Sequence, residues 1–263
     1  MRGILLVIGL LAIGGIAGAA GPFDFDEPPV RPASWAPAAL LPEPVEPAFT
    51  PGRPRPLANR EFLFHWASVR QTVLARTIPA EDAPSVGFLD TVTPEGTTNV
   101  VSVLRRDTGS DGELWVKVRL AALPNGTIGW VPRAALGGYG AVRTQLIVDL
   151  DGMTATLLRN GKTIFKAAVG VGTSAYPTPT GNFYIRNKLR RYSSPFYGPL
   201  AFGTSARSEI LTDWPAGGFV GIHGTNRPEQ IPGAISHGCI RLSNADILKL
   251  GRLMPVGTSV TIK

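Results

Sequence analysis

Short stretches in which apolar and polar residues alternate recur along most of this chain, and a period of two is typical of β-strands. Between them lie segments rich in glycine and proline, which favour turns. The stretches predicted as strands are residues 114–120, 128–131, 144–150, 153–159, 162–169, 182–187, 218–222 and 259–263. The chain is therefore predicted to be mainly β.

Two local signals refine this picture. Asn160-Gly161 predicts a two-residue hairpin turn, because both residues tolerate the positive φ angles that such a turn requires. A minor α component is predicted just after residue 243. Ser243 suits a helix N-cap, Asp246 follows at the third position, and apolar residues then recur at helical spacing up to Pro255.

The length of 263 residues suggests two modest domains. The first is predicted at residues 60–137 and the second at residues 143–263, with the glycine-rich residues 137–140 as the joint. Residues 21–59 are crowded with proline and predict a semi-rigid polyproline-type linker.

Residues 1–20 have the outline of a secretory signal peptide. One arginine precedes an uncharged apolar run, and small residues follow, so cleavage is expected near Ala19 or Ala20. The run is also about long enough to span a bilayer, so an uncleaved N-terminal membrane anchor stays open as the alternative. A lipoprotein anchor would need a cysteine at the cleavage point, and the single cysteine lies at position 239.

The formal net charge is +7. Basic residues are scattered and form no dense run, so nucleic acid is not a predicted partner. An anionic cell envelope fits this charge as well.

The chemistry concentrates in residues 222–244, which hold the single cysteine and two of the three histidines. A free thiol with a pKa of about 8.5 needs a base to become a nucleophile at neutral pH. His223 ends an apolar strand and is the favoured base. His237 precedes Cys239 by two residues and would share its side on an extended segment, but Gly238 makes a bend equally open.

Two other interpretations of Cys239 and the two histidines are open. A single cysteine is often only a small buried hydrophobic residue. His223, His237 and Cys239 could also be three zinc ligands, but no fourth ligand lies at a recognisable spacing. No metal or other cofactor is therefore predicted.

The motif S-H-G-C-I-R at residues 236–241, preceded by His223-Gly224, resembles the signature of the YkuD-type L,D-transpeptidases. The resemblance runs from about residue 143 to residue 263 and includes Gly-Val-Gly at 170–172 and Thr-Pro-Thr-Gly at 178–181. Many members carry Asn where this chain has Arg241, which places it with the HGCIR branch.

The resemblance implies a β-rich catalytic domain in which Cys239 forms an acyl-enzyme with a peptidoglycan stem peptide. It implies that His223 accepts and donates the proton, and that the backbone carbonyl of Gly224 orients its ring. The missing side chain of Gly238 lets the backbone N–H groups of His237 and Gly238, together with that of Cys239, converge on an oxyanion.

Three residues are candidates for substrate binding. Arg241 could hold a stem-peptide carboxylate as a bidentate fork, or it could be a solvated surface charge. Ser236 belongs to the motif itself. Tyr197 lies in an aromatic and basic segment with Tyr192 and Phe196, which could line a substrate groove or simply pack locally.

In the first domain, residues 115–131 carry a W-V-K-V-R-L…N-G-T-I-G-W-V pattern that resembles bacterial SH3-like domains. The fold expected is thus mainly β with minor α: a small SH3-like barrel followed by a YkuD-type β-rich catalytic domain. The SH3-like resemblance implies a module that binds wall peptides or acts as a spacer.

The function expected is an exported L,D-transpeptidase of the cell wall or periplasm that cross-links peptidoglycan stem peptides. Water as the acceptor would make the same site an L,D-carboxypeptidase, and β-lactams of the carbapenem type are the expected inhibitors. The rival hypothesis is a non-catalytic wall-binding protein that keeps the fold.

Overall fold

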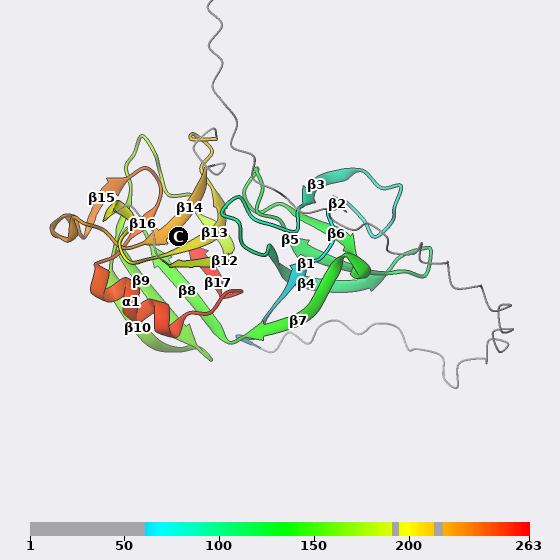
Figure 1. Ribbon diagram of the computed structural model, residues 1–263, viewed down its shortest axis with the longest axis horizontal. Helices are drawn as coiled ribbons and strands as arrows, with labels where there is room; N and C mark the ends of the chain where they lie inside the picture. The colour runs from blue at the N-terminus through cyan, green and yellow to red at the C-terminus, as the bar shows by residue number, and fades with distance from the viewer. Residues whose placement is uncertain (1–60, 191–194, 213–217) are drawn as a thin grey trace, which may run out of the picture. The chain divides into compact units, whose positions relative to one another are not determined.

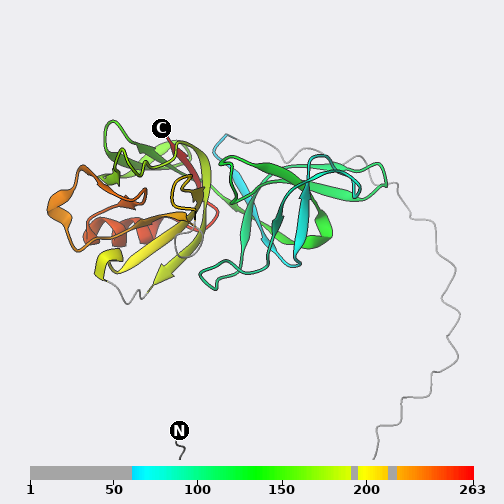
Figure 2. The ribbon, with the colours of Figure 1, turned by 90° about the horizontal axis from the view of Figure 1, so that it is seen from above.

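The computed structural model describes residues 61–190, 195–212 and 218–263 (Figure 1). The predicted signal peptide or anchor and the proline-rich linker lie outside these residues. Among the residues described, no helix is both long and apolar enough to cross a membrane. Two β-sheets dominate, and the prediction of a mainly β chain with minor α is confirmed (Figure 2).

The first domain is a seven-stranded sheet in the order β3-β2-β6-β5-β4-β1-β7. All of its recorded pairings are antiparallel. Its strands are β1 (Phe64–Val69), β2 (Val73–Arg76), β3 (Ser85–Leu89), β4 (Val100–Thr108), β5 (Leu114–Arg119), β6 (Ile128–Pro132) and β7 (Leu136–Val142). A 3₁₀ turn, η1 (Arg133–Ala135), precedes β7. The likeness to an SH3-like barrel stays a prediction.

The glycine-rich residues 137–140 do not form the expected joint. They belong to strand β7, which pairs with β1 and extends to Val142. Gly140 faces the indole of Trp66 across this pair, and a Cβ at Gly140 would lie within 2.4 Å of that ring. Glycine is therefore needed here for close packing of a strand on an aromatic ring, not for a hinge.

The second domain is a ten-stranded sheet in the order β10-β9-β8-β17-β12-β13-β14-β16-β11-β15. It mixes antiparallel pairs with three parallel ones, β17 with β8, β14 with β16 and β11 with β15. Its strands are β8 (Thr144–Asp149), β9 (Thr154–Arg159), β10 (Lys162–Ala168), β11 (Gly170–Gly172), β12 (Gly181–Arg190), β13 (Leu200–Arg207), β14 (Phe219–His223), β15 (Gly233–Ser236), β16 (Ile240–Arg241) and β17 (Ser259–Ile262). Two 3₁₀ turns, η2 (Pro195–Tyr197) and η3 (Pro228–Gln230), lie in its loops.

The local signals of this domain are confirmed. Asn160 and Gly161 have φ angles of 50° and 76° at the turn between β9 and β10, as a two-residue hairpin requires. Helix α1 (Asn244–Leu253) begins after Ser243, whose hydroxyl accepts a hydrogen bond from the N–H of Asp246. Its residues Ile247 and Leu250 are buried in the core of this domain.

Candidate active site

A cavity of about 220 Å³ opens beside strand β14. Five of the residues predicted for the site line it: His223, Cys239, His237, Arg241 and Tyr197. The other described lining residues are Phe196, Ser208, Leu211, Gly218, Phe219 and Val220. Aromatic residues and a cation thus surround a thiol and two imidazoles.

The parallel pairing of β14 with β16 brings the thiol and the histidine to the same place. Ile222 lies opposite Ile240 and His223 opposite Arg241, so Cys239, immediately before β16, comes to lie beside Gly221. The N–H of Gly221 donates to the Cys239 sulfur at 3.4 Å. A Cβ built on Gly221 would be 3.8 Å from that sulfur and 3.7 Å from Cδ2 of His223. The two side chains therefore flank the bare backbone of one glycine.

His223 is buried at the end of β14, with its Nδ1 2.6 Å from the carbonyl oxygen of Gly224. Because a carbonyl can only accept, Nδ1 carries the proton and Nε2 is the basic nitrogen. Burial lowers the pKa of His223 to about 4, with the Arg241 charge acting in the same direction and the Gly224 bond opposing both. The ring is thus a neutral, oriented base at neutral pH.

Cys239 is half-buried. Burial raises the pKa of its thiol, while the Gly221 N–H and the Arg241 charge partly offset that rise by stabilising the thiolate. The resting pair is therefore a neutral thiol beside a neutral imidazole. Neither partner is charged beforehand, so a nucleophilic role for this thiol would require proton transfer to the ring during attack.

The turn that carries Cys239 is held by its own hydrogen bonds. Gly238 has a φ of 107°, which favours glycine, and its N–H donates to the Ser236 hydroxyl at 3.1 Å. The same hydroxyl donates to the Cys239 carbonyl at 2.5 Å. The Thr178 hydroxyl donates to the Gly238 carbonyl at 2.9 Å. The bend at Gly238, left open by the sequence, is therefore present and fixed on both sides.

These bonds bear on two predicted roles. Ser236 is buried and is not among the residues that line the cavity, so what the structure shows for it is fixation of the turn. The Gly238 N–H already donates to Ser236 in this structure. Its role as an oxyanion donor therefore stays a prediction that requires this bond to open.

The other predicted residues lie on the cavity wall. His237 is exposed and its ring lies 4.7 Å from that of Tyr176. Tyr197, in η2, packs edge-on against His223 with ring centroids 4.8 Å apart. Phe196 also lines the cavity, whereas Tyr192 lies outside the described residues.

Arg241 lines the same cavity and lies in register with His223. Its Nε is buried, and within the described part of the chain this atom has no hydrogen-bond partner. An unmet donor of a guanidinium on a cavity wall is suited to an incoming carboxylate.

The zinc alternative gains no support from the geometry. Across residues 61–190, 195–212 and 218–263, no three His, Cys, Asp or Glu side chains are placed so that they could share a metal ion.

Comparison with known proteins identifies the second domain. Residues 143–262 match the family model of the L,D-transpeptidase catalytic domain, YkuD. These residues form an L,D-transpeptidase catalytic domain. The putative L,D-transpeptidase YkuD of Bacillus subtilis is 37% identical over 118 residues, which are 45% of this chain and 65% of the relative.

Two further proteins are similar to part of the chain. The putative L,D-transpeptidase YqjB of B. subtilis is 33% identical over 103 residues, which are 36% of this chain and 57% of the relative. The catalytic domain of an E. faecium L,D-transpeptidase is similar at 25% identity over 46% of this chain and 96% of that chain, with a TM-score of 0.34. The chain thus spans less than two-thirds of the length of these two curated relatives.

Some wall residues of this L,D-transpeptidase domain were not predicted. Phe219 and Val220 line the cavity, whereas the apolar run at residues 218–222 predicts only a buried strand. Thr178 was part of the matched motif, but its contact with the Gly238 carbonyl spans 60 positions. No local pattern in the sequence could have shown that contact.

The depressed pKa of His223 predicts a loss of stability in acid. Between about pH 4 and 6.5 the unfolded chain binds this proton and the folded chain does not, so stability is lost as pH falls through that window. The fall from 6.5 to about 4 corresponds to about 3 kcal/mol, at about 1.4 kcal/mol per pKa unit. Urea unfolding at pH 7 and pH 4.5 should show a larger loss for wild type than for His223→Gln. Equal losses would mean that the ring is not held neutral.

Proposed function

We propose that the protein is an exported L,D-transpeptidase that cross-links peptidoglycan stem peptides through an acyl-enzyme on Cys239. The observation that carries this proposal is that the Cys239 thiol and a neutral, oriented His223 line the same cavity of an L,D-transpeptidase domain, on either side of Gly221. The predicted signal peptide supports export, and the N-terminal anchor is its alternative.

In the acylation step, Nε2 of His223 takes the thiol proton as the Cys239 sulfur attacks the amide carbonyl that follows an L-centre. The negative charge that develops on the carbonyl oxygen needs backbone donors. In this turn, the N–H groups of His237 and Cys239 are the candidate oxyanion donors. The Gly238 N–H becomes a third donor if its hydrogen bond to Ser236 opens. His223 then protonates the departing amine of the terminal D-residue, which leaves a thioester on Cys239.

In the second step, an amine from a neighbouring stem peptide attacks the thioester while His223 takes its proton. The new amide is an L,D cross-link, and the thiol is restored. Water in place of the amine would release a shortened stem peptide, which is the L,D-carboxypeptidase reaction. Arg241 and Tyr197 are proposed to bind the stem peptide, Arg241 through its unmet donor and Tyr197 as part of the aromatic wall.

The test is a reaction with isolated disaccharide tetrapeptide stems, followed by mass spectrometry. We expect release of the terminal D-residue together with cross-linked dimers, and the ratio of dimer to shortened monomer measures transpeptidation against hydrolysis. A folded protein that binds the stems and releases no D-residue would favour the rival wall-binding function.

A further inference from the structure

A buried ion pair joins the two domains. The Arg186 side chain of β12 is 2% exposed, and its Nη2 lies 2.8 Å from Oε1 of Glu95, whose side chain is 13% exposed. Glu95 belongs to the turn between β3 and β4 of the first domain. The ion pair between Arg105 and Asp107, by contrast, is exposed and lies within the first domain. A buried guanidinium without a counter-ion is strongly destabilising, so the second domain draws this partner from the first.

Local structure on both sides prepares this contact. Glu95 lies in a tight turn closed by a bond from the N–H of Thr93 to the carbonyl of Thr97, 2.8 Å long. In β12, the register against β13 shifts between Ile185 and Asn187, which marks a β-bulge. The bulge lets the neighbouring residues Arg186 and Asn187 reach the same carboxylate, whereas neighbours in a regular strand point to opposite faces.

The contact continues toward the active site through Thr204. The Nε of Arg186 donates to the Thr204 carbonyl at 2.9 Å, and the Thr204 hydroxyl donates to the Val220 carbonyl at 2.6 Å. The register of β13 against β14 shifts between Gly203 and Arg207. At this irregular point a side-chain hydroxyl therefore holds the backbone of the cavity wall.

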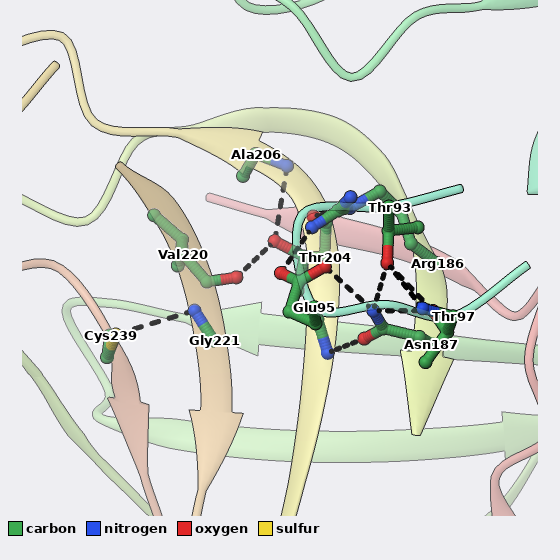
Figure 3. A network of polar contacts seen from close by, with 11 residues as sticks. Thr93, Glu95, Thr97, Arg186, Asn187, Thr204, Ala206, Val220, Gly221 and Cys239 are labelled. Carbon is green, nitrogen blue, oxygen red and sulfur yellow. Dashed lines mark hydrogen bonds and ion pairs between the residues drawn. The ribbon is translucent and has the colours of Figure 1, made fainter. Parts of the chain in front are cut away.

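The Val220 carbonyl and the Gly221 N–H belong to one planar peptide unit. The carbonyl end is held by Thr204, and the N–H end donates to the Cys239 sulfur at 3.4 Å (Figure 3). Fixing one end of the plane fixes the direction of the other. We propose that Glu95 is a positioning residue of the active site, which acts through Arg186 and Thr204 to hold the Gly221 N–H on Cys239.

Two further contacts support the same wall. The guanidinium carbon of Arg186 lies 3.7 Å from the ring centroid of Phe219, which lines the cavity. Asn125 of the first domain accepts from the N–H of Arg207 at 2.9 Å and donates to its carbonyl at 2.8 Å, at the end of β13. The first domain thus contacts strands β12 and β13. In the sheet, β13 lies next to β14, the strand that carries Gly221 and His223.

The test measures how fast iodoacetamide alkylates Cys239 as a function of pH, with intact-protein mass spectrometry as the readout. This reaction uses the thiol and no peptidoglycan, so its result is independent of the proposed function. Loss of the Gly221 bond destabilises the thiolate and should move the alkylation profile to higher pH. The charged or ionisable side chains that line the cavity with the thiol, namely His223, His237, Arg241 and Tyr197, stay unchanged in every variant.

We expect Thr204→Val to slow alkylation at pH 7 by about threefold to tenfold, the usual worth of one hydrogen bond. Glu95→Gln should also slow alkylation, but by a smaller factor than Thr204→Val. Thr204→Ser keeps the hydroxyl and should therefore have the wild-type alkylation profile. The matched controls are Glu81→Gln and Thr163→Val, both at exposed positions. They should leave the profile unchanged.

A purely structural ion pair would lower the melting temperature in Glu95→Gln without moving the alkylation profile, and that result would overturn the proposal. If Thr204→Val does not fold, Glu95→Gln alone decides. In an Arg186→Met background, Glu95→Gln should have no further effect on alkylation. If Glu95→Gln slowed alkylation in that background as much as it does in wild type, the effect of Glu95 would not pass through Arg186.

Discussion

Replacing His223 by alanine should slow acylation of Cys239 by about two to four orders of magnitude, the usual contribution of positioned proton transfer. The neutral thiol cannot attack without losing its proton, and burial raises the thiol pKa further. In wild type the rate should fall in acid with a midpoint near pH 4, where His223 becomes protonated. In His223→Ala this acid limb should vanish, and the rate should instead rise in alkali as thiolate forms.

His237→Ala is the matched control for this prediction. His237 is exposed and lines the same cavity, so its replacement should cost rate through the geometry of the turn and leave the acid limb in place. The measurement is the rate of acylation by a carbapenem against pH for the three proteins, with folding checked by thermal melting. If the acid limb is lost in His237→Ala and kept in His223→Ala, the base has been assigned to the wrong histidine.

Local patterns predicted much of the fold because they report local physics. The Asn160-Gly161 turn follows from φ preferences, and helix α1 follows from its cap and its apolar spacing. Strand β14 was predicted from its apolar run, with His223 at its end. His223 was favoured as the base for Cys239, and the parallel pairing of β14 with β16 brings the two residues to the same place.

Other features depend on contacts between distant residues and could not be predicted in this way. The glycines at 137–140 suggested a joint between the two domains, but Gly140 is required by the Trp66 ring that packs on β7. No pattern in the sequence indicated that the Ser236 hydroxyl would accept a hydrogen bond from the Gly238 N–H. Glu95 is one of many scattered charges in the sequence, and only the fold shows that it meets Arg186.

Replacing Cys239 by alanine should abolish both the covalent adduct with a carbapenem and the release of the terminal D-residue from stem peptides. The alanine side chain has no nucleophile, and the other lining residues offer no second thiol, since Cys239 is the single cysteine of the chain. Cys239→Ser is the stricter variant because it keeps the shape of the side chain. We expect it to be inactive too, since an imidazole with a pKa of about 4 is a weak base for a hydroxyl.

The most direct measurement is intact-protein mass spectrometry after incubation with a carbapenem, followed by peptide mapping of the adduct. We expect one adduct per chain in wild type, located on Cys239, and none in Cys239→Ala or Cys239→Ser. An adduct on another residue, or an undiminished rate of D-residue release in Cys239→Ala, would contradict it.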